Sequence, residues 1–267
     1  MIKLIITDMD GTLLNNNHEV DNEFWPLLEK LNEKNIIFAI ASGRPYYNLA
    51  DKFKNVKDKL LFIAENGSLV IYKDEELFSS VISKEDVKKI KDICKEISQI
   101  VPIYCTKDFA YIEKSYFDSN EELIKNEVKK YYNNMKIVDD IEKVEQKFIK
   151  VAICDYLGSE TNCYPILKKY EAIFQIVISG KIWADISKIG INKGVAISKA
   201  QENLNIAYDE TMAFGDYLND VEMMKQAKYS YAMKNAHKDL IKVANFITKD
   251  DNNNLGVINT IKENISI

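Results

Sequence analysis

The sequence predicts an α/β fold, in which a Rossmann-like core with a parallel sheet is interrupted by an inserted α+β segment. Short apolar runs alternate with helical patterns at both ends of the chain, which is typical of a parallel sheet. The middle of the chain lacks this alternation and carries its strands in pairs. The length of 267 residues also fits two domains better than one. We therefore expect one domain made of residues 1–82 and 188–267, with a second domain, residues 83–187, inserted into it.

At the N-terminal end, strands and helices follow one another in turn. The predicted strands are the apolar runs 3–7, 36–41, 61–64 and 68–72. The first helix carries one apolar face, formed by Phe24, Leu27, Leu28 and Leu31. Pro45 opens the second helix, and Asn66-Gly67 between the last two strands is a strong signal for a hairpin turn. This order predicts right-handed crossovers in a parallel sheet.

The middle segment predicts an α+β arrangement. Ser83-x-x-Asp86 resembles a capping box at the start of a helix, and Ser119-x-x-Glu122 resembles a second one. A further helix is expected over residues 161–170. The predicted strands are residues 101–105, 109–113, 148–154, 174–179 and 183–187. Regular alternation resumes after Lys188, with strands at 211–215, 229–232 and 246–248 and helices at 194–203, from Asp220, at 236–243 and up to about Glu263.

The composition excludes several classes of protein. Apolar residues make up 46% and charged residues 29%, which is typical of a globular chain. Four cysteines without a C-x-x-C pair, and two histidines, argue against a structural zinc site. The net charge of −5, with both signs mixed, argues against a partner nucleic acid. The first apolar run stops at Asp8, too early for a signal peptide, and no apolar stretch is long enough to span a membrane. We expect a cytoplasmic protein; the sequence leaves its oligomeric state open.

Glycines mark the segments that carry the chemistry. The chain has only nine, so each is expected where a side chain would clash or where φ is positive. Five of them lie beside polar residues: Gly11 beside Asp10, Gly43 beside Ser42, Gly67 beside Asn66, Gly194 beside Lys193, and Gly215 beside Asp216.

Two acids, Asp8 and Asp10, directly follow the first strand. Ligands gather at the carboxyl ends of parallel strands, and residues two apart lie on the same side of a strand. Two carboxylates this close favour either a bound divalent cation or a raised pKa for one of them. A plain acidic turn after a strand would show the same residues.

Three further clusters of polar residues lie directly after predicted strands or at the start of predicted helices. Ser42-Gly43-Arg44 combines a hydroxyl, a glycine N–H and the start of a helix, which together suit an anion, although an ordinary helix cap has the same pattern. Lys193 at a helix start is either a solvated lysine or a charge that offsets carboxylates and a phosphate. Asp216, Asn219 and Asp220 follow a strand and suit a hard cation such as Mg²⁺, or a helix cap.

In this order, the segments D-x-D-G-T, S-G-R, K-G and G-D-x-x-N-D resemble the motifs of the haloacid dehalogenase-like (HAD) phosphatases, and within them the Cof-type sugar phosphatases. Glu65-Asn66-Gly67 agrees as well. The resemblance covers residues 1–82 and 188–267, whereas the middle segment agrees with the cap domain of the family in length and position only. Ser42 stands where threonine is common, Lys234 where the family has glycine, and Tyr217 where a smaller residue is usual. The resemblance implies a HAD core with a cap that sets substrate choice.

The same resemblance implies a role for each residue. Asp8 would be the nucleophile that forms an aspartyl-phosphate, and Asp10 the general acid and base. The phosphoryl group would be bound by Ser42, the N–H of Gly43, Lys193 and Asn219. Mg²⁺ would be bound by Asp8, Asp216, the backbone carbonyl of Asp10, and Asp220, the last acting through water or by orienting Lys193.

The implied function is a Mg²⁺-dependent phosphatase of small phosphorylated metabolites, with sugar phosphates favoured. A phosphosugar mutase or phosphotransferase that uses the same aspartyl-phosphate is the alternative enzyme, and a non-enzymatic binding module is a third possibility. The chain lacks the G-x-x-x-x-G-K-[ST], G-x-G-x-x-G and G-x-S-x-G motifs, which argues against NTPases, dinucleotide-binding enzymes and serine hydrolases. The sequence does not identify the natural substrate or the residues that select it.

Overall fold

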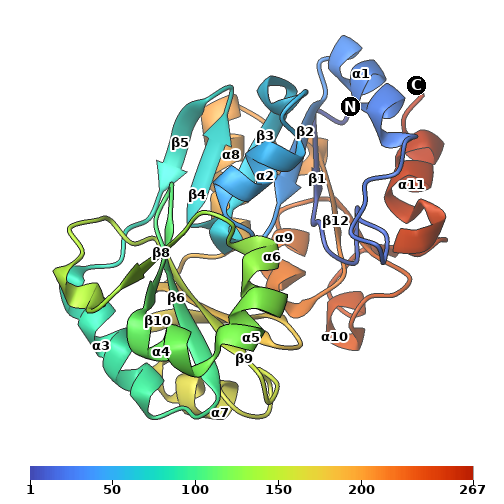
Figure 1. The fold of residues 1–267 in the computed structure, drawn as a ribbon. Coiled ribbons are helices and arrows are strands. Elements are labelled where there is room, and N and C mark those ends of the chain that lie inside the picture. The colour runs from blue at the N-terminus through green and yellow to red at the C-terminus, as the bar shows by residue number, and fades with distance from the viewer. Residues whose placement is uncertain (267) are drawn as a thin grey trace. The chain divides into compact units, whose positions relative to one another are not determined.

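A computed structural model describes residues 1–266. The contacts between Cα atoms divide the chain into two units, coloured by residue number in Figure 1. The first unit contains residues 1–42, 53–78 and 192–267, and the second contains residues 43–52 and 79–191. The first unit therefore contains both ends of the chain. Assigning the two units to a catalytic domain and a cap remains a prediction.

The sheet of the first unit has eight strands, and its six consecutive strands from β14 to β3 are parallel. The order across the sheet is β14 (Phe246–Ile247), β13 (Tyr229–Ala232), β12 (Thr211–Gly215), β1 (Leu4–Thr7), β2 (Ile37–Ala41), β3 (Leu60–Ala64), β4 (Leu69–Tyr72) and β5 (Glu75–Ser79). The predicted parallel α/β core is confirmed. In Figure 1, β12 from late in the chain lies beside β1 from its start.

Apolar side chains on both faces explain why β1 is central. Leu4, Ile5 and Ile6 have no exposed surface, although they point to alternate sides of the sheet. Helix α1 (Phe24–Glu33) buries all four residues of its predicted apolar face. Within it, the ring of Phe24 packs edge-to-face on Phe38 of β2, with 5.2 Å between the centroids. These contacts hold the strands whose carboxyl ends carry the motifs.

The remaining helices of the first unit are short or moderate in length. They are η1 (Lys57–Lys59), η2 (Glu65–Gly67), α8 (Lys193–Leu204), η6 (Tyr208–Glu210), η7 (Leu218–Asp220), α9 (Val221–Met224), α10 (Lys238–Ile241), η8 (Asn252–Asn254) and α11 (Gly256–Asn264). Helix α8 packs its alanines Ala196 and Ala200 and its Ile197 into the core cluster that also contains Leu4 and Ile6. This packing brings the start of α8 to the sheet.

The second unit is built on a mostly antiparallel six-stranded sheet. Its order is β10 (Phe174–Gly180), β11 (Trp183–Lys188), β9 (Lys150–Asp155), β6 (Ile100–Cys105), β7 (Ala110–Glu113) and β8 (Met135–Val138), and only β7 and β8 are parallel neighbours. Its helices are α2 (Tyr46–Lys52), α3 (Lys84–Lys95), α4 (Lys114–Ser119), α5 (Glu121–Leu123), the π-helical η3 (Ile124–Val128), α6 (Lys129–Tyr131), η4 (Ile141–Lys143), α7 (Tyr164–Leu167) and η5 (Lys168–Tyr170). The predicted α+β character of this segment is therefore observed.

Some local predictions of helices and strands in the two units were wrong. The predicted helix cap at Ser83 is present, since its side chain accepts a hydrogen bond from the N–H of Asp86. The carboxylate of Asp86 accepts from the hydroxyl of Ser83. Ser119 is instead the last residue of α4, where its hydroxyl donates to the carbonyl of Ser115. The N-cap of the following helix is Asn120, which makes no side-chain capping bond. Strands β5 and β8 were not predicted because both are edge strands without a buried alternating face. Within residues 1–266, no helix has the length and apolar character needed to cross a membrane.

Candidate active site

The predicted motifs meet because neighbouring parallel strands end at one edge of the sheet. Thr7 of β1 lies opposite Phe214 of β12 and Ile40 of β2. The residues that follow these positions therefore share that edge. The N–H of Asp8 continues the pairing by donating to the carbonyl of Phe214 at 2.9 Å. Asp216 thus comes beside Asp8 although more than 200 residues separate them in the sequence.

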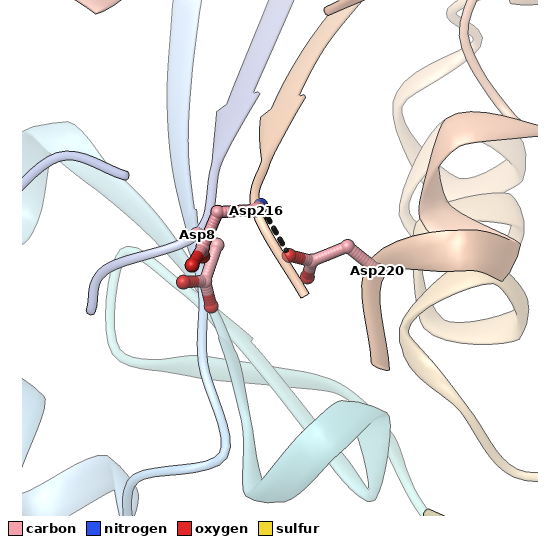
Figure 2. Close-up of side chains that lie close together, drawn as sticks. All are labelled: Asp8, Asp216 and Asp220. Atoms are coloured by element: carbon pink, nitrogen blue, oxygen red, sulfur yellow. Dashed lines mark hydrogen bonds between the residues drawn. The ribbon is translucent and has the colours of Figure 1, made fainter. Parts of the chain in front are cut away.

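Three carboxylates gather there. Oxygen atoms of Asp8, Asp216 and Asp220 all lie within 4.8 Å of one another. Figure 2 shows Asp8 and Asp216 side by side, with Asp220 extending toward the backbone of Asp216. The side chain of Asp220 has no exposed surface and that of Asp8 is only 10% exposed. Carboxylates buried this close together require compensating positive charge.

Lys193 provides part of that charge. Its Nζ lies 2.5 Å from Oδ1 of Asp8 and 2.6 Å from Oδ1 of Asp220, and its side chain is fully buried. The start of α8 places it, since the side chain of Asn192 caps the helix by accepting from the N–H of Val195. The alternative of a solvated lysine at this position is therefore wrong.

Asp220 is bonded through both of its oxygens. Oδ1 accepts from Lys193, while Oδ2 accepts from the backbone N–H groups of Asp216 and Tyr217 at 3.0 and 3.2 Å. The carboxylate therefore holds the loop after β12 and the lysine at the same time. Of the two predicted modes of action, through water to the metal or by orienting Lys193, these contacts fit the second better.

The electrostatics of the cluster suit a divalent cation. Burial raises the pKa of Asp8 to about 7 despite the opposing effect of Lys193, and the charge of Asp220 adds to the rise. Burial, followed by the charges of Asp8 and Asp220, holds the pKa of Asp216 well above its ordinary value. A hard cation would relieve this repulsion, and carboxylate oxygens are its preferred ligands. The residues present therefore fit such an ion.

Gly11 leaves the space in which the carboxylate of Asp216 lies. Its φ is +80°, and a Cβ at this position would lie 2.4 Å from Oδ2 of Asp216. Thr12 then donates from its hydroxyl to Oδ1 of Asp216 at 3.0 Å. Thr12 was not predicted as a site residue, although its place in the D-x-D-G-T motif was a usable signal.

Asp10 lies outside the buried cluster. Its side chain is 37% exposed, and Oδ1 is 3.1 Å from Nδ1 of His18. This exposure lets water reach the carboxyl group, as the predicted role of general acid and base requires. His18 was missed because nothing in the local sequence links it to Asp10; its left-handed backbone, with φ of 60°, turns the chain back toward the acid.

The predicted phosphate-binding residues occupy different surroundings. Ser42 is buried at the end of β2, where its N–H donates to the carbonyl of Ile63. Asn219 donates from its side-chain amide to Oδ1 of Asn66 at 2.9 Å. Gly43 belongs to the second unit, where its carbonyl accepts from the Lys150 amine at 2.5 Å. Contact of Ser42, Gly43 and Asn219 with a phosphoryl group remains a prediction.

Comparison with known proteins identifies the family. The model of the haloacid dehalogenase-like hydrolases matches residues 5–261. The chain is a haloacid dehalogenase-like hydrolase. The family predicted from the motifs is therefore confirmed, and this hydrolase is a phosphoric monoester hydrolase, as the names of its relatives also indicate.

Relatives of this hydrolase match it over nearly the whole chain. It is 30% identical over 266 residues to the 5-amino-6-(5-phospho-D-ribitylamino)uracil phosphatase YbjI of Escherichia coli K12, with 97% of this chain and 95% of that protein covered. It is 25% identical over 272 residues to a Bacillus subtilis phosphatase of the same description, YcsE, covering 98% and 95% of the two chains. The crystal structure of SMU.1108c from Streptococcus mutans matches with a TM-score of 0.91 and 31% identity over 100% of both chains.

The start of α8 in this hydrolase depends on Gly194. A Cβ at this position would lie 2.5 Å from the backbone oxygen of Glu222. Alanine normally stabilises a helix by about 1 kcal/mol relative to glycine, but a backbone clash of this kind costs about 1–3 kcal/mol. Gly194→Ala is therefore expected to lower the free energy of unfolding, by up to about 2 kcal/mol in urea titrations. Ser198→Ala in the same helix is the control and should leave stability unchanged or slightly raised; a Gly194→Ala protein as stable as this control would contradict the close packing.

Proposed function

We propose that the chain is a Mg²⁺-dependent phosphatase that hydrolyses small phosphorylated metabolites through an aspartyl-phosphate on Asp8. The observation that carries the proposal is the buried contact of Lys193 with Asp8 inside a cluster of three carboxylates. One buried amine is shared between Asp8 and Asp220, and the carboxylate of Asp216 remains beside them, so carboxylates outnumber the amine in the cluster. Such an arrangement suits the binding of a cation and of an anionic phosphate.

In the first step, a carboxylate oxygen of Asp8 forms a bond to phosphorus while the ester P–O bond breaks. The leaving oxygen takes the proton of Asp10 and departs as an alcohol. Lys193 fixes the Asp8 carboxylate through Oδ1 and offsets the negative charge of the approaching phosphate. A cation held by Asp8, Asp216 and the carbonyl of Asp10 would add positive charge at the phosphoryl oxygens when bound.

In the second step, water attacks the phosphorus of the aspartyl-phosphate. Asp10, now ionised, accepts the proton of this water while the bond between phosphorus and the Asp8 oxygen breaks. Inorganic phosphate leaves, and the Asp8 carboxylate is regenerated. The partial exposure of Asp10 beside the buried Asp8 supports this division of roles, because the base must reach water and the nucleophile must be shielded from it. Ser42, the N–H of Gly43 and Asn219 are proposed to bind the phosphoryl oxygens in both steps.

For the substrate, we propose a phosphomonoester of a polyhydroxylated carbon chain. This class includes the sugar phosphates predicted from the motifs, and also the phosphoribitylamino-uracil that appears in the names of YbjI and YcsE. The segment 83–187 is proposed as the cap that selects among them, and residues 1–82 and 188–267 as the catalytic domain.

The test is a panel of phosphorylated compounds incubated with the purified protein and scored by released phosphate. The panel contains hexose 6-phosphates, pentose 5-phosphates, 5-amino-6-(5-phospho-D-ribitylamino)uracil, a nucleoside monophosphate and an aryl phosphate. We expect release of phosphate with Mg²⁺, a fall of about 100-fold or more with excess EDTA, and recovery when Mg²⁺ is restored. Activity unaffected by EDTA would refute the metal requirement. An isomerised sugar phosphate without free phosphate would favour the mutase.

A further inference from the structure

The turn between β3 and β4 has an unusual backbone. Glu65, Asn66 and Gly67 have φ values of 53°, 52° and 98°, so three consecutive residues are left-handed, and all three are buried. A two-residue Asn-Gly hairpin needs positive φ at two positions only, and a glutamate in this region is strained. Strain of this kind persists only where surrounding contacts impose it, and it is common at functional sites.

The side chain and backbone of Asn66 join two motif segments of the first unit. Its Oδ1 accepts from Nδ2 of Asn219 at 2.9 Å, and its N–H donates to the carbonyl of Ser42 at 3.0 Å. Ser42 and Asn219 are more than 170 residues apart in the sequence. Asn66 therefore connects two of the residues proposed to bind phosphate without itself being one of them.

Gly67 connects the turn to a third segment. A Cβ at this position would lie 2.3 Å from the carbonyl oxygen of Asn192 and 3.0 Å from the N of Lys193. Only a residue without a side chain allows the turn to lie against the backbone at the start of α8. The turn thus contacts the segments of Ser42, Lys193 and Asn219, which belong to separate motifs of the sequence.

The amide of Asn219 has further bonding capacity. A side-chain amide has two N–H donors and an acceptor oxygen. One N–H is used by Asn66, and within residues 1–266 the buried Oδ1 of Asn219 has no hydrogen-bond partner. Buried polar atoms are normally paired, so the unpaired Oδ1 would accept from a donor group of a bound molecule. The second N–H of the same amide is the group that can donate to a phosphoryl oxygen.

We propose that Asn66 is a positioning residue for the phosphate-binding groups. Its side chain orients the amide of Asn219, and the left-handed turn that contains it fixes the positions of Ser42 and of the start of α8. This inference rests on the proposed function, because it assigns Asn66 a role in the same site. Asn66 does not touch the reacting atoms; it acts through Asn219.

The test compares Asn66→Gly, Asn219→Ala and the double variant. Glycine keeps the left-handed backbone and removes only the side-chain acceptor, so Asn66→Gly is expected to fold. Asn205→Gly is the matched control, because Asn205 at the end of α8 is also left-handed, with φ of 53°. With an aryl phosphate, we expect kcat/KM to fall about 10–100-fold in Asn66→Gly and to stay at the wild-type value in Asn205→Gly.

The double variant separates positioning from a general loss of stability. If Asn66 acts through Asn219, adding Asn66→Gly to Asn219→Ala should cause little further loss, whereas independent effects would multiply. The dissociation constant of inorganic phosphate should rise in parallel in the two single variants. An Asn66→Gly protein that matches Asn205→Gly in both measurements, or losses that multiply, would overturn the inference. A wild-type protein that binds phosphate but hydrolyses no ester would refute the proposed function, while the binding comparison would still decide the role of Asn66.

Discussion

Replacing Asp8 with asparagine is expected to lower kcat for an aryl phosphate by about 1,000-fold or more, because an amide cannot act as the nucleophile. The isosteric change keeps the shape of the side chain at the end of β1. It also removes one of three neighbouring carboxylates, so the repulsion that raises the pKa of Asp216 falls. Thermal unfolding should therefore stay near or above the wild-type temperature, which would separate lost chemistry from lost folding.

The control for this variant is Asp58→Asn. Asp58 is an exposed acid in η1 of the same unit, outside the carboxylate cluster. Its replacement should leave both kcat and the unfolding temperature unchanged. Wild-type turnover in the Asp8→Asn protein would refute the assignment of Asp8 as nucleophile. A trapped phosphoprotein that forms in the wild type and not in Asp8→Asn would give direct support.

Replacing Lys193 with methionine is expected to have the largest effect on stability. The change leaves the buried carboxylates of Asp8 and Asp220 without the amine that both contact. Removing one partner of a buried ion pair costs about 3–5 kcal/mol, because the remaining charge stays desolvated. We expect a fall of this size in the free energy of unfolding measured in urea, together with loss of turnover.

Two further variants make the result interpretable. Lys199→Met lies on the same helix, where the lysine side chain is 43% exposed and paired with Glu202, so it should change stability by less than about 0.5 kcal/mol. Adding Asp220→Asn to Lys193→Met removes one of the uncompensated charges and should restore part of the lost stability. A Lys193→Met protein as stable as Lys199→Met would contradict the ion-pair role of the lysine.

The parts of this protein that were predictable from sequence depend on short-range patterns. The apolar run before Asp8 predicted β1, and the periodic face of α1 predicted which of its residues are buried. Once the strands are parallel, the residues after each strand must share one edge, so the convergence of Asp8 and Asp216 followed from topology. The hairpin between β3 and β4 was predictable because Asn66-Gly67 is a turn signal that acts over two residues.

Other features were decided by packing between distant segments. Lys193 could be solvated or buried at a helix start, and only the packing of α8 on the sheet placed its amine between Asp8 and Asp220. The pairing of His18 with Asp10 depends on how a loop closes, which leaves no periodic signal.

By itself, the sequence determined most of the strands and helices and the chemistry at the strand ends, because hydrophobic periodicity and turn residues act over a few positions. The tertiary structure alone decided which polar groups become partners. The bond between Asn66 and Asn219 joins residues 153 positions apart. Such contacts form only when the whole unit packs. Burial then determines how much each charge and amide contributes to the free energy of folding.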